Sequence, residues 1–214
     1  CDVVFTNSAY TAADAVERLG LSEERVRVAP PGLGEGFAPA GERAELGRPF
    51  ALGLATLEPR KNLARLVEAW RLLDGELHLA LAGGDGGGEQ PALAEPGLHR
   101  LGYVPDEEVP RLLRGAAVFV YPSLFEGFGM PVVEAMACGT PVVASAHPSL
   151  DEACGDAAVR VEPRDPEAIA AGIREALARR EELVPRGLEH ARRFTWRAVG
   201  ETFLRAYREA GSGL

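Results

Sequence analysis

Lysine, asparagine and cysteine are scarce in this sequence of 214 residues, although 26% of it is charged. Among its 23 basic residues only Lys61 is a lysine, and asparagine occurs only at Asn7 and Asn62. The preference for arginine indicates a GC-rich genome, and the scarcity of thermolabile amides is consistent with heat tolerance. The adjacent pair Lys61 and Asn62 runs against this bias, which favours a specific role for Lys61 over chance.

Other scarcities exclude whole classes of protein. The three cysteines (Cys1, Cys138 and Cys154) are odd in number and show no paired spacing, so no disulfide framework is expected. Four scattered histidines predict no metal site. No apolar run approaches the ~18–20 residues of a membrane-spanning helix. The net charge of −9 comes without a basic stripe, which argues against a nucleic-acid partner. We therefore expect a cytoplasmic globular protein.

Short apolar runs alternate with helical patterns along the chain. The runs predict strands at Val3–Thr6, Val26–Ala29, Phe50–Thr56, Leu77–Ala82, Leu98–Leu101, Ala117–Tyr121, Pro141–Ser145 and Ala157–Val161. Continuous rather than alternating runs are typical of parallel strands that are covered on both faces. The pattern predicts an α/β fold, a Rossmann-like parallel sheet with helices on both faces. Such sheets bind ligands at the carboxyl ends of their strands.

Capping residues mark the predicted helices. Asn62, Asp106, Asp165 and Thr195 are each expected to cap a helix, and Pro131 suits the first turn of another. These helices are expected to end near Gly75, Arg114, Arg180, Ala210 and Gly139, respectively. Residues 30–48 are rich in proline and glycine and predict a linker or long loop.

The strongest functional signal is the stretch 121–145, which reads YPSLFEGFGMPVVEAMACGTPVVAS. A predicted strand ends near Tyr121, a loop follows, and a helix begins near Pro131. The free N–H groups of such a loop and the helix dipole would attract an anion. Gly127 and Gly129 would let the backbone approach a phosphate closely.

Two carboxylates accompany this predicted anion site. Glu126 lies in the loop, and Glu134 lies eight positions later in the first turns of the helix. Carboxylates repel an anion, so they fit such a site only if they serve hydroxyl groups. A nucleoside diphosphate sugar supplies both features, because it carries a diphosphate for the amides and diols for the carboxylates.

A second signal is the stretch 56–62, which reads TLEPRKN between a predicted strand and a predicted helix. It therefore lies at the same edge of the sheet. Arg60 and Lys61 would form a cationic clamp for a diphosphate, the arginine as a bidentate fork and the lysine as a point charge. Such a clamp would stabilise the charge of a departing diphosphate.

Two weaker patterns are interpreted as structural, and a third stays open. The glycine-rich stretch 81–88 fails the G-x-G-x-x-G spacing of a dinucleotide site, because Asp85 and Glu89 fall on required glycines, and it is taken as a flexible loop. His147 and Cys138 have no organised partner in the sequence. The loop 102–106 is interpreted equally well as an ordinary turn or as a ligand contact.

The stretch 121–145 resembles the E-x7-E motif of retaining glycosyltransferases with the GT-B fold, of the glycogen synthase and mannosyltransferase type (family GT4). The resemblance implies that Glu126 contacts the transferred sugar and that Glu134 binds the ribose hydroxyls of the nucleotide. It also implies that the loop amides help to hold the sugar and the phosphates, a role that falls to Gly127, Phe128, Gly129 and Met130.

Two further stretches resemble the same family. Residues 56–62 are similar to its G-R-L-x-x-x-K-G motif, in the variant of mannosyltransferase-like members. Lys61 matches position for position, whereas the usual arginine of the motif falls on Thr56, and whether Arg60 replaces it stays open. The loop with Tyr103 and Val104 matches the family segment that often contacts the nucleobase through main-chain groups.

The resemblance spans nearly the whole chain and implies how it is organised. Residues 1–40 are expected to be a remnant of an N-terminal domain and its linker. Residues 41–194 are expected to be the C-terminal GT-B domain that binds the nucleotide sugar, and 195–214 a helix that packs on the N-terminal domain. We therefore expect a fragment whose partners are the sugar-nucleotide donor and an acceptor domain outside the sequence. Peripheral membrane association through that domain is an option.

The implied reaction is retaining transfer of a hexose, with mannose as a candidate, from a nucleoside diphosphate sugar to a glycan or lipid-linked acceptor. The resemblance implies no metal and no cofactor. Three alternatives stay open: a binding module that is inactive without its acceptor domain, a GT-B nucleotide-sugar epimerase, and a structural domain without a ligand. The sequence specifies neither the base, nor the sugar, nor the acceptor.

Overall fold

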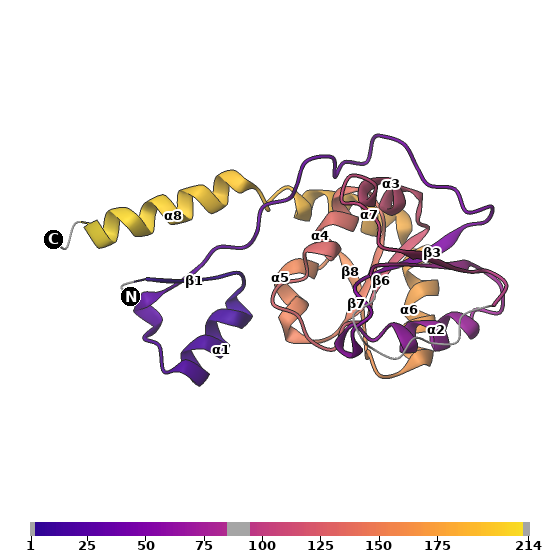
Figure 1. The fold of residues 1–214 in the computed structure, drawn as a ribbon, viewed down its shortest axis with the longest axis horizontal. Coiled ribbons are helices and arrows are strands. Elements are labelled where there is room, and N and C mark those ends of the chain that lie inside the picture. The colour runs from indigo at the N-terminus through magenta and orange to yellow at the C-terminus, as the bar shows by residue number, and fades with distance from the viewer. Residues whose placement is uncertain (1–2, 85–94, 212–214) are drawn as a thin grey trace.

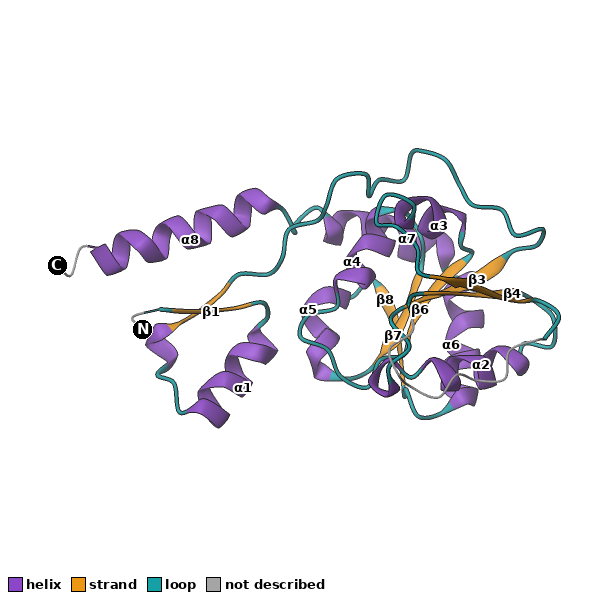
Figure 2. Cartoon of the chain, viewed as in Figure 1, coloured by secondary structure: helices purple, strands orange, loops and turns teal. Residues whose placement is uncertain are grey.

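A six-stranded sheet forms the centre of the larger lobe of the molecule, which comprises residues 50–194 (Figures 1 and 2). The computed structural model describes residues 3–84 and 95–211. The strands lie in the order β5-β4-β3-β6-β7-β8, and all neighbours are parallel. Their bounds are β3 Phe50–Leu54, β4 His78–Ala82, β5 Leu98–Gly102, β6 Val118–Tyr121, β7 Val142–Ser145 and β8 Ala158–Val161. The predicted Rossmann-like parallel sheet is confirmed.

The order of the strands reverses at the centre of this sheet. From β3 the chain passes to β4 and β5 on one side, and it then returns to β6 and continues to β7 and β8 on the other. β3 and β6 are neighbours, with Ala51 opposite Val118. The connections that leave their carboxyl ends therefore diverge, and a crevice opens between them. In open α/β sheets this is the place where ligands bind.

Helices cover both faces of the sheet because its strands are apolar on both sides. On one face α2 (Leu63–Arg71) packs beside α6 (Pro166–Ala178). The opposite face carries α3 Val109–Gly115, α4 Met130–Ala137, α5 Asp151–Cys154 and α7 Arg180–Ala191. Consecutive strand residues serve opposite cores, as Ala51 packs with α2 and α6 while Leu52 packs with α3 and α4. This double burial explains the continuous apolar runs of the sequence.

The smaller lobe combines residues 3–28 and 196–211, from opposite ends of the described chain (Figure 1). Its elements are β1 Val4–Thr6, α1 Ala9–Leu19, β2 Val26–Val28 and α8 Trp196–Gly211. β1 and β2 pair in parallel, and α1 contacts both of them. In residues 3–84 and 95–211 there are also three short 3-10 helices, Glu23–Arg25 in this lobe and Pro59–Lys61 and Pro148–Leu150 in the larger one.

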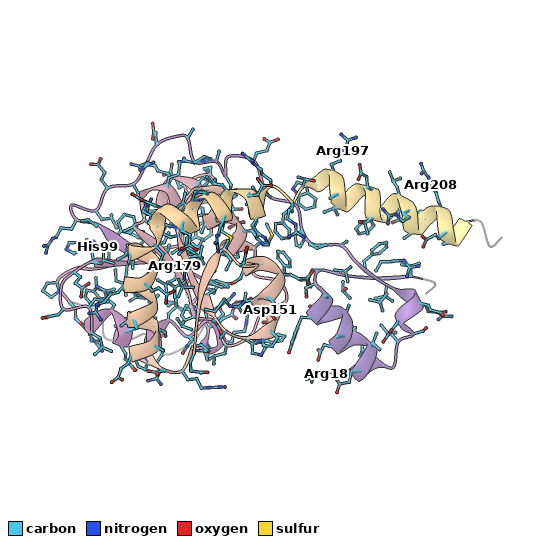
Figure 3. The ribbon with its side chains drawn as sticks, turned by 180° about the vertical axis from the view of Figure 1, so that it is seen from behind. Arg18, His99, Asp151, Arg179, Arg197 and Arg208 are labelled. Atoms are coloured by element: carbon cyan, nitrogen blue, oxygen red, sulfur yellow. The ribbon has the colours of Figure 1, made fainter. Side chains whose placement is uncertain are left out.

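Helix α8 lies beside this small sheet. The ring of Phe203 stacks on that of Phe5, with centroids 3.9 Å apart. Arg197 and Arg208 lie on the side of α8 that faces away from α1 (Figure 3). Among the described helices, α8 included, none is both long and apolar enough to cross a membrane.

Two chain crossings join the lobes, and they touch one another. The first is the segment 29–49 and the second is 192–195. The amide of Leu33 donates to the carbonyl of Phe194 over 2.9 Å. A Cβ atom on Gly32 would come within 2.4 Å of the Trp196 nitrogen, so glycine is required for this close approach.

Most local predictions are confirmed. Every predicted strand occurs, with ends shifted by one or two residues. The Asp165 carboxylate accepts from the amides of Glu167 and Ala168 at the start of α6, and the Thr195 hydroxyl accepts from the amide of Ala198 in α8. The sequence reasoning missed three helices, α1, α5 and α7.

Two predicted caps are wrong. α3 begins at Val109 rather than after Asp106, whose carboxylate instead faces a cleft described below. Asn62 does precede α2, but its side chain makes no capping hydrogen bond. Its amide instead donates to the carbonyls of Pro122, over 3.1 Å, and Pro163, over 2.6 Å. Asn62 therefore ties together the connections that follow β3, β6 and β8.

Candidate functional site

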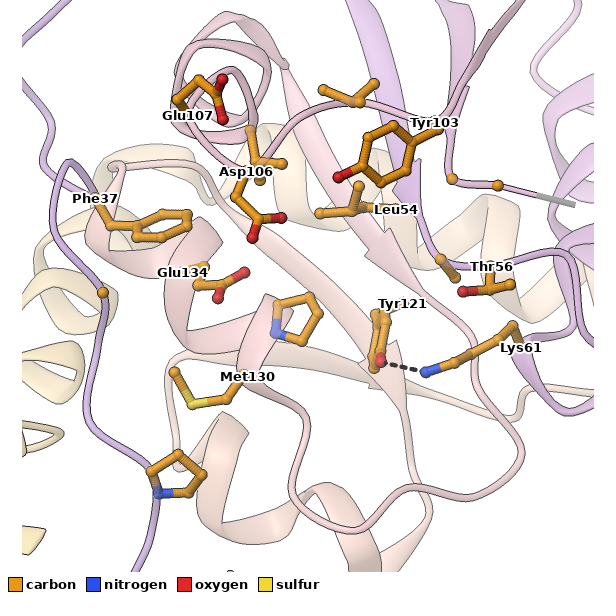
Figure 4. A pocket seen from close by; sticks show the side chains of 18 of the residues that line it. Phe37, Leu54, Thr56, Lys61, Tyr103, Asp106, Glu107, Tyr121, Met130 and Glu134 are labelled. Carbon is orange, nitrogen blue, oxygen red and sulfur yellow. Dashed lines mark hydrogen bonds between the residues drawn. The ribbon is translucent and has the colours of Figure 1, made fainter. Parts of the chain in front are cut away.

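A cleft of about 790 Å³ opens at the crevice between β3 and β6 (Figure 4). Lys61 reaches it from the connection after β3, and Glu134 reaches it from α4, which follows β6. The sequence predicted that these two residues lie at one edge of the sheet. In the structure both side chains open onto this single cleft, with Tyr121 between them (Figure 4).

A buried ionic cluster forms one wall of the cleft. The Lys61 ammonium donates to the Glu126 carboxylate over 2.6 Å and to the Tyr121 hydroxyl over 2.9 Å. The Tyr121 hydroxyl in turn donates to the same oxygen of Glu126 over 2.8 Å. An ammonium group has three N–H donors. Two of them are used within the described part of the chain, which leaves the third for a ligand.

Arg60 extends the cluster toward solvent. Its guanidinium donates to Glu126 over 3.1 Å and to Glu58 over 2.9 Å, and it also lines the cleft. Burial alone would raise the pKa of the Glu126 carboxyl, but the hydrogen bond and charge of Lys61 hold this pKa below its usual value. Glu126 is therefore an anion, and its two cationic partners are both within reach of the cleft.

The loop between β6 and α4 presents unpartnered amides. Within residues 3–84 and 95–211, the N–H groups of Gly127, Phe128 and Gly129 donate to no protein acceptor. Gly129 precedes α4 with φ of 102°, a left-handed conformation that favours glycine. Met130 and Pro131 begin the helix and line the cleft. The amides and the α4 N-terminus thus offer an anion a set of free donors.

Glu134 lies at the other end of the cleft, next to a second carboxylate. Burial and the nearby charge of Asp106 raise the pKa of Glu134 to about 7. Among the described residues, no cation contributes to the pKa shift of Glu134. A carboxyl group that is half-buried and unpaired beside an open cleft can accept hydrogen bonds from ligand hydroxyl groups.

The remaining predicted residues fall into two groups. Thr56, Tyr103 and Val104 line the cleft, and Tyr103 is 75% exposed at its rim. The Phe128 side chain lies in the core against Phe194, so only its main chain can face a ligand. The Gly127 carbonyl accepts from hydroxyl groups of α1.

Several cleft residues were not predicted as part of the site. Gly83 and Gly84 line the cleft, and a Cβ atom on Gly83 would come within 1.9 Å of the Ala55 carbonyl. The rest of the glycine-rich stretch, residues 85–88, lies outside the described residues. Tyr121 lies inside the stretch 121–145, but no feature of that stretch indicates that its hydroxyl bridges a cation and an anion. Asp106 was visible only as a candidate cap.

His147 and Cys138 do not line this cleft. Burial raises the pKa of the Cys138 thiol to about 11, which keeps it in the unreactive protonated form. His147 contacts Ser149, whose hydroxyl accepts from the Glu126 amide over 3.1 Å. In the described part of the chain, no three histidine, cysteine or acidic side chains converge as metal ligands.

Comparison with known proteins gives a consistent picture. Residues 37–194 match the family described as Glycosyl transferases group 1. The O-antigen chain mannosyltransferase B of Escherichia coli is 40% identical over 173 residues, which cover 74% of this chain and 45% of that protein. The MMP alpha-(1->4)-mannosyltransferase of Mycolicibacterium hassiacum is 32% identical over 222 residues, covering 97% of this chain and 54% of that protein. The chain thus spans about half the length of these relatives.

Solved structures share the fold. The sucrose-phosphate synthase of Thermosynechococcus elongatus aligns with a TM-score of 0.79 at 24% identity, over 100% of this chain and 59% of that chain. HepE of Anabaena, solved in complex with UDP-glucose, aligns with a TM-score of 0.81 at 18% identity, over 99% of this chain and 64% of that chain. At 18–24% sequence identity, these two alignments show that the fold is shared.

Proposed function

Because the chain belongs to the family Glycosyl transferases group 1, we propose that it supplies the donor site of an enzyme that transfers a hexose from a nucleoside diphosphate sugar with retention of configuration. Mannose is the first candidate for the sugar, since relatives over most of this chain are named mannosyltransferases. The named ligand of the Anabaena structure, UDP-glucose, supports a nucleotide sugar as the class of donor.

One observation carries the proposal, namely that Lys61 and Glu134 share a cleft that Met130, the first residue of α4 after the free loop amides, also lines. A diphosphate needs positive charge and N–H donors, and a ribose needs an acceptor for its hydroxyl groups. The cleft offers these groups in that order along one wall. Its volume of about 790 Å³ lies within the range of small-molecule sites.

The proposed roles follow from this order. The third N–H of Lys61 and the Arg60 guanidinium would bind the diphosphate, together with the amides at the start of α4. Glu134 would accept hydrogen bonds from the ribose hydroxyls. Glu126, which is held in place by Lys61, would contact the transferred sugar. Tyr103 and Val104 would lie against the base.

In the proposed reaction the bond between the anomeric carbon and the diphosphate oxygen breaks while the acceptor oxygen bonds to the same face of that carbon. The departing phosphate oxygen takes the proton of the acceptor hydroxyl. Lys61 and Arg60 would stabilise the charge that builds on the leaving group, which is commonly a large contribution to catalysis. We propose that these cations make a divalent metal unnecessary, so nucleotide binding is expected to be unchanged by EDTA.

We also propose how the acceptor binds. The smaller lobe would belong to the acceptor-side domain, and the acceptor would bind between that domain and the cleft. Peripheral contact with a membrane, if the acceptor is lipid-linked, would then be made by that domain.

Calorimetry with UDP, GDP and ADP tests the donor site directly. We expect one of these nucleotides to bind and to raise the melting temperature of the chain, as a ligand of the native state does. Lys61→Ala and Glu134→Ala should each weaken that binding about ten-fold or more, since each removes a charged or desolvated partner. Arg197→Ala and Glu189→Ala are matched controls, because both side chains are exposed outside the cleft.

Two results would contradict these assignments. Wild-type affinity in both cleft variants would remove Lys61 and Glu134 from the site, and no heat with any nucleotide would favour a domain without a ligand. With a matching acceptor domain supplied, transfer of the hexose distinguishes a transferase from an epimerase, which would instead isomerise the nucleotide sugar.

A further inference from the structure

Helix α1 of the smaller lobe is attached directly to the loop that carries Glu126. The Ser8 hydroxyl, at the N-terminus of α1, lies 2.6 Å from the carbonyl oxygen of Gly127, and the Thr11 hydroxyl lies 3.1 Å from the same oxygen. Ser8 is 1% exposed, so its contact is made away from water. Ser8 and Thr11 are 119 and 116 positions away from Gly127 in the chain, yet both contact its carbonyl.

The Ser8 and Thr11 hydroxyl groups share the Gly127 carbonyl as an acceptor. A serine hydroxyl donates one proton and accepts at its lone pairs. The Ser8 oxygen accepts from the Thr11 amide over 2.9 Å, which caps α1, and its one proton goes either to the Gly127 carbonyl or to the Thr11 hydroxyl. The Thr11 hydroxyl has its own proton for the Gly127 carbonyl in both cases. The carbonyl is therefore held by Thr11 directly, and by Ser8 either directly or through Thr11.

Fixing the Gly127 carbonyl also orients the next amide. In a trans peptide unit the C=O and the following N–H point in opposite directions. The carbonyl of Gly127 points to α1, so the N–H of Phe128 points away from α1. This N–H is one of those without a protein acceptor in the described residues. The two hydroxyl groups thus decide where a free donor of the candidate site points.

A second set of contacts holds the other side of Glu126. The ring of Tyr10, also on α1, makes edge contacts with Phe125 at 5.8 Å and with His147 at 5.6 Å between centroids. Phe125 and His147 contact each other in the same manner at 5.9 Å. α1 therefore touches the residue before Glu126 as well as the residue after it, while Lys61 holds the carboxylate.

Close packing leaves this loop little freedom next to α1. A Cβ atom on Gly127 would come within 2.9 Å of the Asn7 side chain. The amide of Ala9 also donates to the Glu152 carboxylate of α5. The first turn of α1 is thus anchored on the larger lobe at two points, one of them the loop of the site.

From these contacts we infer that Ser8 and Thr11 are positioning residues for the donor sugar, acting across the two lobes through the Gly127 carbonyl. The inference rests on the proposed function. It predicts a separable effect, because α1 contacts the loop next to Glu126 but neither Lys61 nor Glu134. Loss of the hydroxyls should disturb the sugar end of the donor and spare the nucleotide end.

The test compares a nucleotide sugar with its own nucleoside diphosphate on the same variants of this chain. The pairs are UDP-glucose with UDP and GDP-mannose with GDP, of which the pair that binds to the wild type is used. Thr11→Val removes only a hydroxyl at constant shape and leaves the Ser8 cap in place. Ser8→Ala removes the other donor together with the cap. Ser22→Ala is the matched control, since Ser22 is exposed and its side chain makes no cap hydrogen bond.

We expect Thr11→Val and Ser8→Ala each to raise the Kd of the nucleotide sugar about three- to ten-fold, the range that one lost hydrogen bond gives. The Kd of the nucleoside diphosphate should change less than about two-fold, and Ser22→Ala should match the wild type for both ligands. The effects of Ser8 and Thr11 should be non-additive in the double variant, because both act on one carbonyl.

Other outcomes overturn the inference. If Thr11→Val binds both ligands as the wild type does, and only Ser8→Ala weakens binding, the Ser8 hydroxyl serves as a helix cap and nothing more. If both ligands weaken equally, α1 stabilises the larger lobe as a whole. If neither ligand of either pair binds to the wild type, the proposed function fails, and the inference fails with it.

Discussion

Glu134 is a cleft side chain whose ionisation is shifted toward neutral pH. Burial and Asp106 raise its pKa from 4.5 to about 7 in the folded chain. Between these values the unfolded chain loses the Glu134 proton first, so ionisation of this residue costs stability as the pH rises from about 4.5 to 7. Glu134→Gln should therefore stabilise the unliganded chain above pH 7, by on the order of 1–3 kcal/mol after allowance for partial exposure.

Urea denaturation at pH 5 and pH 8 measures this effect. The stability gained by Glu134→Gln should be larger at pH 8 than at pH 5, and Glu189→Gln, at an exposed position, provides the control. A gain that is the same at both pH values would place the pKa of Glu134 near its ordinary value. In the proposed function the ionised carboxylate accepts from ribose hydroxyls, so nucleotide affinity should rise with pH over the same interval.

The Tyr121 hydroxyl is the neutral member of the ionic cluster. It accepts from Lys61 and donates to Glu126, and burial raises its pKa above the usual value. Tyr121→Phe should destabilise the chain by about 1–2 kcal/mol, because the two charged groups lose a shared hydrogen-bond partner. Thermal denaturation checks this result against Tyr207→Phe, whose ring is 64% exposed. Equal stability of the two variants would mean that water replaces the Tyr121 hydroxyl.

Asn62 joins three connections of the sheet, those that follow β3, β6 and β8. Asn62 has φ of 59°, and its amide donates to carbonyls after β6 and β8. Asn62→Gly should lower the free energy of unfolding by about 1–3 kcal/mol, because the two hydrogen bonds are lost. Asn62→Ala should lower it by a further ~1–2 kcal/mol, because alanine is strained in this left-handed conformation.

Asp74 provides the control for this pair of variants. Asp74 also has a left-handed conformation, with φ of 48°, but its side chain is exposed. Asp74→Gly therefore places a glycine in the same backbone conformation without removing a bridge between loops. Chemical denaturation should find Asp74→Gly at least as stable as the wild type. If Asn62→Gly is equally harmless, the connections are held by other contacts.

The elements of the larger lobe could be predicted because their signals are local. A strand that is buried on both faces needs a continuous apolar run, and a cap such as Asp165 lies within three residues of the amides it serves. Asp106 and Asn62 carry the same local signal as a cap, yet tertiary contacts use their side chains differently. α7 has no side-chain cap at its start, whereas α1 was missed although Ser8 caps it.

For the candidate site, the sequence predicts which residues come together but not how each of them is packed. The spacing of Glu126 and Glu134, with Lys61 on the neighbouring connection, follows from motifs at the carboxyl ends of β3 and β6. That Glu126 is buried behind Lys61, whereas Glu134 is open to the cleft, depends on packing that no spacing reveals. The approach of Gly83 to Ala55, and of α1 to Gly127, likewise joins residues far apart in the chain.

Within the smaller lobe, helix α8 is attached to β1 by the stacking of Phe203 on Phe5. Phe203→Ala would remove its stacking on Phe5 and should weaken the attachment of α8 by about 1–2 kcal/mol, since the ring is partly exposed. Hydrogen exchange should show faster exchange in α8 and unchanged protection in β3 and β6. Leu204→Ala, at a residue that is 55% exposed on the same helix, is the control. Uniform loss of protection would show instead that the lobes unfold together.

The chain passes between the lobes twice, and the two passages meet at Gly32 against Trp196 and at Leu33 against Phe194. The lobes also meet away from this crossing, where Ser8 and Thr11 contact Gly127 and the amide of Ala9 donates to Glu152. These contacts fix how the smaller lobe lies against the loop beside Glu126. A rotation of the lobes about the crossing would have to break them, and it would leave the Gly127 carbonyl without its partners on the smaller lobe.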